Sequence, residues 1–180
     1  MQRRSGGTSV AARRRSPGFS LYELIVSIAL VGVFSGVLLD RLLYYEEVAE
    51  KAVVELQAST LKVALQVHVG DLISRNQKLD YAAIAHENPI RWLDQPLVGY
   101  RGEFSTDAAA ELPKGSWFFD RSTAQLVYLL KLDRNFRPVS SDGPTRVRWH
   151  VRLVRPDGAR TKDSTVVGLQ FVPVVPYRWF

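Results

Sequence analysis

The longest apolar stretch of the chain lies near its start. Leu24 to Leu39 contains sixteen residues without a charge, and Glu23 is the only charged residue between Phe19 and Asp40. A helix from Phe19 to Leu39 would be about 32 Å long, close to the ~30 Å hydrocarbon core of a bilayer. Because a soluble core helix seldom presents apolar residues on every side, residues 19–41 are predicted to be a transmembrane helix; a buried helix of a soluble protein is the alternative.

Beyond Asp40 the apolar residues become periodic. They recur at spacings of three, four or seven, typical of one helix face: Leu42, Tyr45, Ala49, Ala52, Leu56, Val63 and Val67. No Pro occurs between Pro17 and Pro89 to interrupt the helix. The pattern therefore predicts one helix from about Leu21 to Ser74. We expect this face, with Leu56 and Val63 in the core, to cover a globular domain over residues 42–180.

The rest of the chain predicts β-structure after a long connection. Residues 76–114 show no sustained period, with short helical pieces expected at Tyr81–His86 and Ile90–Leu93. Two hairpin patterns follow, formed by residues 116–120 with 125–131 and by 146–154 with 166–172. The expected fold class is α+β, in which a long N-terminal helix packs on a four-stranded antiparallel sheet.

Charge and composition narrow the function classes. The formal net charge is +6, but five Arg lie among the first 18 residues, which contain no Asp or Glu, so the remainder carries only +1. A nucleic-acid partner is therefore not expected. The absence of Cys excludes disulfides and thiolate chemistry.

The junction between the basic leader and the apolar stretch carries a family resemblance. Gly18-Phe19-Ser20-Leu21-Tyr22-Glu23-Leu24, followed by an uncharged span, resembles the cleavage segment of type IV prepilins and type II secretion pseudopilins. The resemblance implies that a prepilin peptidase removes leader 1–18 by cutting between Gly18 and Phe19 and methylates the new amine of Phe19. It also implies a pilin fold, and it implies that Glu23 meets that amine on a neighbouring subunit of a filament.

Departures from the family pattern favour a minor pilin or minor pseudopilin. The chain lacks the helix-kinking Pro in the span and the C-terminal disulfide loop that are common in type IVa pilins. Major pseudopilins usually carry a calcium site late in the sheet. The nearest acidic candidates, Asp142, Asp157 and Asp163, stand singly in predicted turns without the alternating ligands of a calcium loop. We expect no metal and no cofactor.

Candidate catalytic chemistry is sparse. His68, His86 and His150 show no metal-binding spacing, and neither a G-x-S-x-G sequence nor a phosphate-binding loop occurs. Arg146, Arg148 and Arg152 alternate with apolar residues along one predicted strand, as on a solvent-facing side, although a basic binding face is the alternative. The chain is therefore not expected to be an enzyme or to bind a small-molecule substrate.

Two functions remain. The first is a structural subunit of a type IV pilus or type II secretion pseudopilus, with the prepilin peptidase, other pilin or pseudopilin subunits, the inner-membrane assembly platform and membrane lipid as partners. The second is a single-pass, signal-anchored extracytoplasmic binding protein that does not assemble into a filament. The excess of Arg before the span predicts a cytoplasmic N-terminus and a periplasmic or extracellular domain in a bacterial cytoplasmic membrane.

Overall fold

The structure is a computed structural model that describes residues 20–105, 111–138, 146–155 and 168–180. The chain divides into two compact units, Met1–Leu42 and Leu43–Phe180. The helix α1 (Leu21–Ser74) begins in the first unit and contributes its C-terminal part to the second. The predicted extent of this helix is confirmed, and it is long and apolar enough to cross a membrane.

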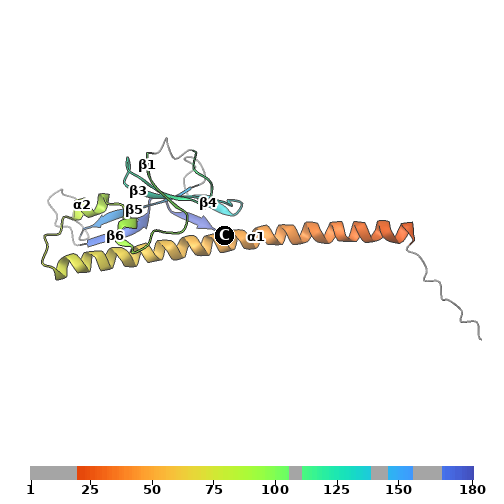
Figure 1. Ribbon diagram of the computed structural model, residues 1–180, viewed down its shortest axis with the longest axis horizontal. Coiled ribbons are helices and arrows are strands. Elements are labelled where there is room, and N and C mark those ends of the chain that lie inside the picture. The colour runs from red at the N-terminus through yellow and green to blue at the C-terminus, as the bar shows by residue number, and fades with distance from the viewer. Residues whose placement is uncertain (1–19, 106–110, 139–145, 156–167) are drawn as a thin grey trace, which may run out of the picture. The chain divides into compact units, whose positions relative to one another are not determined.

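The second unit is α+β. Figure 1 shows α2 (Tyr81–His86) and the strands that follow α1. Within the described residues a 3-10 helix η1 (Pro89–Trp92) lies between α2 and the strands in the chain, and the strands number seven. The strands are β1 (Tyr100–Phe104), β2 (Trp117–Asp120), β3 (Gln125–Leu129), β4 (Phe136–Pro138), β5 (Arg146–Val154), β6 (Gly168–Pro173) and β7 (Tyr177–Trp179). Asp80 caps α2 because its carboxylate accepts from the amides of Ala82 and Ala83.

The main sheet has five strands in the order β1-β2-β3-β5-β6, and a separate ribbon pairs β4 with β7. The hairpins β2–β3 and β5–β6 are antiparallel, as predicted. The expected four-stranded antiparallel sheet is nevertheless wrong in detail, because β1 adds a fifth strand parallel to β2. Residues 100–104 show no alternation and contain Gly102, so only pairing with a distant strand defines β1.

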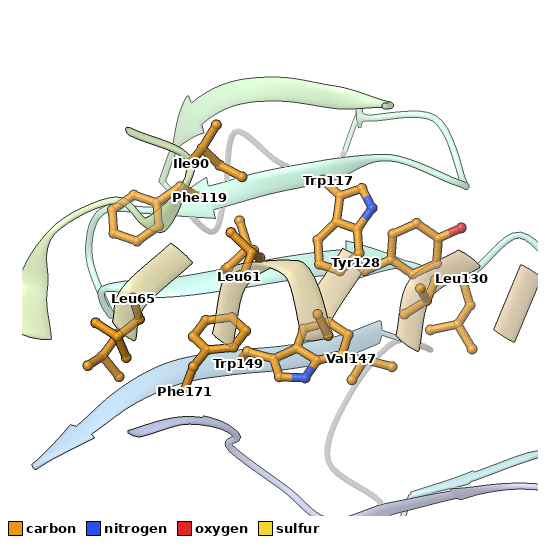
Figure 2. Packing of buried hydrophobic residues seen from close by; sticks show 14 of the residues in the cluster. Leu61, Leu65, Ile90, Trp117, Phe119, Tyr128, Leu130, Val147, Trp149 and Phe171 are labelled. Atoms are coloured by element: carbon orange, nitrogen blue, oxygen red, sulfur yellow. The ribbon is translucent and has the colours of Figure 1, made fainter. Parts of the chain in front are cut away.

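The core of the second unit lies between α1 and the inner face of the sheet. Figure 2 shows Leu61 and Leu65 of the helix among Trp117, Trp149 and Phe171 of the strands. The two Trp rings lie 5.1 Å apart, and the indole of Trp117 donates a hydrogen bond to Gln57 of the helix at 2.7 Å. The sheet therefore holds one side of α1 through both apolar and polar contacts.

Candidate functional site

The side of α1 that meets the sheet is its packed side. Val54, Ala58, Leu61 and Leu65 are buried there, and Leu61 is 0% exposed. They follow one another at spacings of three and four, which places them on one face of a helix. This packed side fixes the helix to the domain.

The opposite side of α1 carries a second set of apolar residues, which we name the exposed stripe: Tyr45, Ala49, Ala52, Leu56, Val63 and Val67. Leu56 is 68% exposed, Val63 56% and Val67 65%. At about 100° per residue, these positions lie across the helix from Leu61 and Leu65. The stripe is therefore an apolar surface that the described residues of the domain leave uncovered.

This result corrects the sequence prediction. Leu56, Val63 and their periodic neighbours were expected to cover the sheet, but they point away from it, and Leu42 is exposed as well. Both sides of the helix carry apolar residues at helical spacing, so the period alone does not identify the buried one. Glu47 and Glu50 lie on the packed side, and their charge made that side look solvated in the sequence.

Glu47 is a buried carboxylate, 1% exposed. Its Oε1 accepts hydrogen bonds from the amide of Asn135 at 2.8 Å and the indole of Trp179 at 3.1 Å, and its Oε2 accepts from Nδ2 of Asn135 at 2.8 Å. Three donors satisfy the charge. Glu47 thus joins the helix to the loop before β4 and to β7.

Glu50 plays a similar role one turn further on. Its carboxylate accepts from the hydroxyl of Tyr128 at 2.9 Å and from the amides of Lys131 and Leu132 at 2.6 and 2.9 Å. Burial, followed by the hydrogen bond and charge of Glu50, raises the pKa of Tyr128 above its ordinary value. Neither carboxylate is among the functional residues predicted from the sequence, although the seven-residue interval that links Glu47, Val54 and Leu61 was an available signal.

The C-terminal segment lies against the same part of the helix. Lys51 Nζ donates to the main-chain oxygen of Trp179 at 2.9 Å and lies 5.7 Å from the ring centre of Phe180. The ring of Phe180 also meets Tyr44 edge-on, with 5.3 Å between ring centres. Aromatic side chains therefore gather where α1 enters the second unit.

Of the residues that carry the family resemblance, only those from Ser20 onward belong to the described part of the chain. Gly18, Phe19 and the leader 1–18 fall outside the described residues. Glu23 is in the first turn of α1, where it is exposed, and no described side chain pairs with its carboxylate. Its main-chain oxygen accepts from Ser27 Oγ at 2.7 Å. None of the most apolar 18-residue window of α1 is buried.

The three His lie in different settings. His68 stacks on Trp92 with 5.5 Å between ring centres, whereas His86 Nδ1 lies 2.8 Å from the carbonyl oxygen of Ala82. Within the described ranges, no group of His, Asp and Glu is arranged to hold a metal ion. The acidic candidates Asp142, Asp157 and Asp163 fall outside those ranges.

The alternating cations occupy one face of β5, opposite its buried residues. Arg146, Arg148 and His150 are half-buried there, and only Arg152 is exposed, donating to Gln170 at 2.7 Å. This face is thus less solvated than the sequence suggests. Burial, and then the charge of Arg152, lowers the pKa of His150.

Comparison with known proteins returns no relative: no family model, no curated protein and no solved structure matches the chain. The geometry of α1 and its surroundings is therefore the basis for a proposed function.

Proposed function

We propose that this chain is a structural subunit, of the minor pilin or minor pseudopilin kind, of a type IV pilus or type II secretion pseudopilus. The single observation that supports this best is the exposed stripe of α1. A helix already packed on a sheet through one side has little reason to carry large apolar residues on the other unless a partner covers them. In a filament, the same helix of neighbouring subunits would cover the stripe.

The composition of the stripe suits helix-to-helix contact. Ala49 and Ala52 are small and both exposed, so another helix can approach closely, while Leu56 and Val63 supply apolar area. The stripe contains no charged residue. The competing function, a signal-anchored binding protein that stays single, gives this surface no partner.

The first part of α1 would contact lipid before assembly and other subunits afterwards. In this proposal a prepilin peptidase removes leader 1–18 on the cytoplasmic side, and the domain of residues 42–180 lies outside the cytoplasmic membrane. The Arg asymmetry around the span favours this orientation.

Glu23 is the residue we assign to assembly. A carboxylate in an apolar span is costly, by about 2.5–3.5 kcal/mol at the centre of a bilayer and less near its edge. Cleavage would create a positive amine at Phe19, four residues away on the chain. Pairing between Glu23 of one subunit and the amine of the next would compensate both charges and set the axial offset between helices.

Two measurements on cells that contain a prepilin peptidase test the proposal. Mass analysis should find a mature chain that begins with methylated Phe19, and Gly18→Val should leave the chain uncut. Glu23→Ala should be cut normally but cross-link poorly to other subunits. An uncut wild-type chain, or wild-type cross-linking of Glu23→Ala, would contradict the processing or the assembly step respectively.

A further inference from the structure

Two arginines face each other across the β4–β7 ribbon. Arg137 and Arg178 are direct partners in the antiparallel register, and both are exposed. Their neighbours on each strand, Phe136 and Trp179, are buried on the other side of the ribbon. Like charges in directly opposite positions destabilise a strand pair. An anionic partner on this face would offset that repulsion.

Within the described residues, neither guanidinium pairs with the side chain of an Asp or a Glu. Arg137 donates to the main-chain oxygens of Arg134 and Phe136, at 3.3 and 3.1 Å, and Arg178 donates to the main-chain oxygen of Phe180 at 3.1 Å. Two other exposed Arg side chains of this unit do pair with acids: Arg75 with Asp71, and Arg91 with Glu103, each at 2.9 Å. The ribbon arginines therefore keep most of their donors available.

The ribbon ends beside the residues that follow the apolar span. Phe180 comes directly after β7 and contacts Tyr44, which is five residues beyond Leu39 in the same helix. Five residues of helix correspond to about 8 Å. Tyr44, at 42% exposed, and Phe180, at 37%, are only partly covered. Tyr is enriched at the level of lipid headgroups because its ring is amphipathic, and Phe180 packs against the ring of Tyr44.

We propose that Tyr44, Arg137, Arg178 and Phe180 form a juxtamembrane surface that binds the phosphates of an anionic lipid bilayer. This inference rests on the proposed membrane span of α1. The two guanidiniums bind headgroup phosphates, for which their fork of donors is well suited. The two rings lie at the interface between headgroups and acyl chains. Before assembly, this contact holds the domain down on the membrane that anchors it.

The attraction between the two arginines and an anionic membrane should depend on salt and on lipid charge. Each Arg close to an anionic membrane surface raises the affinity by about fivefold, and the effect falls off within a Debye length. Raising the ionic strength from about 0.1 M to about 1 M shortens that length from about 10 Å to about 3 Å. The juxtamembrane surface should therefore bind strongly to phosphatidylglycerol at low salt and weakly at high salt or to phosphatidylcholine.

The experiment uses the full chain in lipid nanodiscs. Because the chain has no Cys, Pro138→Cys provides one spin-label position next to Arg137. A small fraction of lipid carries a gadolinium chelate on its headgroup, and the relaxation rate of the label reports how close the ribbon lies to the headgroups. We expect a several-fold larger relaxation enhancement in phosphatidylglycerol discs than in phosphatidylcholine discs, and its loss at high salt.

Two double variants that each remove two positive charges distinguish an effect of the juxtamembrane surface from an effect of the net charge of the protein. Arg137→Gln with Arg178→Gln should reduce the enhancement in phosphatidylglycerol to the phosphatidylcholine value. Arg75→Gln with Arg121→Gln removes two exposed arginines elsewhere in the second unit and should leave it unchanged. Equal enhancement in the two lipids, or an unchanged enhancement in the Arg137/Arg178 variant, would overturn the proposal and favour a protein partner for these arginines.

A second spin label tests the proposed membrane span of α1 separately from the juxtamembrane surface. Val31→Cys places a label in the middle of the apolar span, where lipid-dissolved oxygen should relax it strongly. If the label at position 31 is buried in lipid but the relaxation enhancement at position 138 is the same in both lipids, only the proposal of the juxtamembrane surface is overturned. A water-exposed label at 31 overturns the membrane span and the juxtamembrane surface together.

Discussion

The two sides of α1 within the second unit both carry apolar residues at helical spacing but differ in their polar residues. The packed side contains Glu47 and Glu50, whose carboxylates accept hydrogen bonds from loop amides and from Trp179 and Tyr128. The exposed stripe contains no charge and includes the small residues Ala49 and Ala52. Fixed hydrogen bonds define one orientation of helix against sheet, whereas an uncharged surface with small residues accepts another helix at short distance. A charged residue on a helix is therefore no guide to the side that faces water.

The largest effect on stability is expected at the packed side. Leu61→Ala removes a side chain that is 0% exposed and leaves a cavity against the aromatic core, so it should lower the free energy of unfolding by about 2–5 kcal/mol. Denaturant unfolding of the full chain in micelles, followed by near-ultraviolet circular dichroism of the core Trp residues, measures this. A loss below about 0.5 kcal/mol, the range of ordinary surface changes, would contradict the assignment of Leu61 to the core.

A smaller loss is expected from Glu47→Gln. The amide oxygen can keep the hydrogen bonds from the amide of Asn135 and from Trp179, but the amide nitrogen faces another donor, Nδ2 of Asn135. A lost hydrogen bond to a charged group costs about 1.5–3 kcal/mol. Glu46→Gln is the matched control, because Glu46 is exposed and forms no hydrogen bond among the described residues. Equal stability of the two variants would show that the Glu47 hydrogen bonds do not hold the ribbon to the helix.

The stability of the protein at alkaline pH tests the contact between Glu50 and Tyr128. The pKa of Tyr128 is raised in the folded state, so the folded protein keeps a proton that the unfolded chain loses above about pH 10. The contribution of Tyr128 to the free energy of unfolding is therefore complete below pH 10. Above pH 10 it falls by at most about 1.4 kcal/mol per pH unit. In Tyr128→Phe the decline between pH 10 and 11 should be shallower. It should not vanish, because burial also raises the pKa of Tyr100 and Tyr177. An unchanged slope would contradict the role of Tyr128.

Local patterns predicted the elements that depend on local patterns. The bounds of α1 follow from an apolar stretch and a helical period without Pro, and the β2–β3 hairpin follows from two apolar runs around a polar turn. The alternation of β5 predicts that strand residue for residue. In contrast, β1, β4 and β7 are only three to five residues long and form by pairing with distant segments. No periodicity in the sequence therefore predicts these three strands. The direction in which α1 faces the sheet depends on Glu47, whose donors lie at positions 135 and 179. Such contacts join residues far apart in the chain, so the local interval from Glu47 to Leu61 does not by itself show which side of the helix faces the sheet.

The smallest effect on stability, and the sharpest test of the comparison, is expected from Leu56→Ala. The side chain of Leu56 is 68% exposed, so the free energy of unfolding should change by no more than about 0.5 kcal/mol. The expected loss is much larger for Leu61→Ala, five residues away. If the exposed stripe is an assembly surface, the same variant should weaken cross-linking between subunits, and Leu56→Glu should weaken it more because a carboxylate in a helix contact is costly. Lys62→Glu, an exposed change off the stripe, is the control for added negative charge. A Leu56→Ala chain that unfolds like Leu61→Ala would place both residues in one core. A Leu56→Glu chain that cross-links like wild type would instead leave the stripe without its proposed partner.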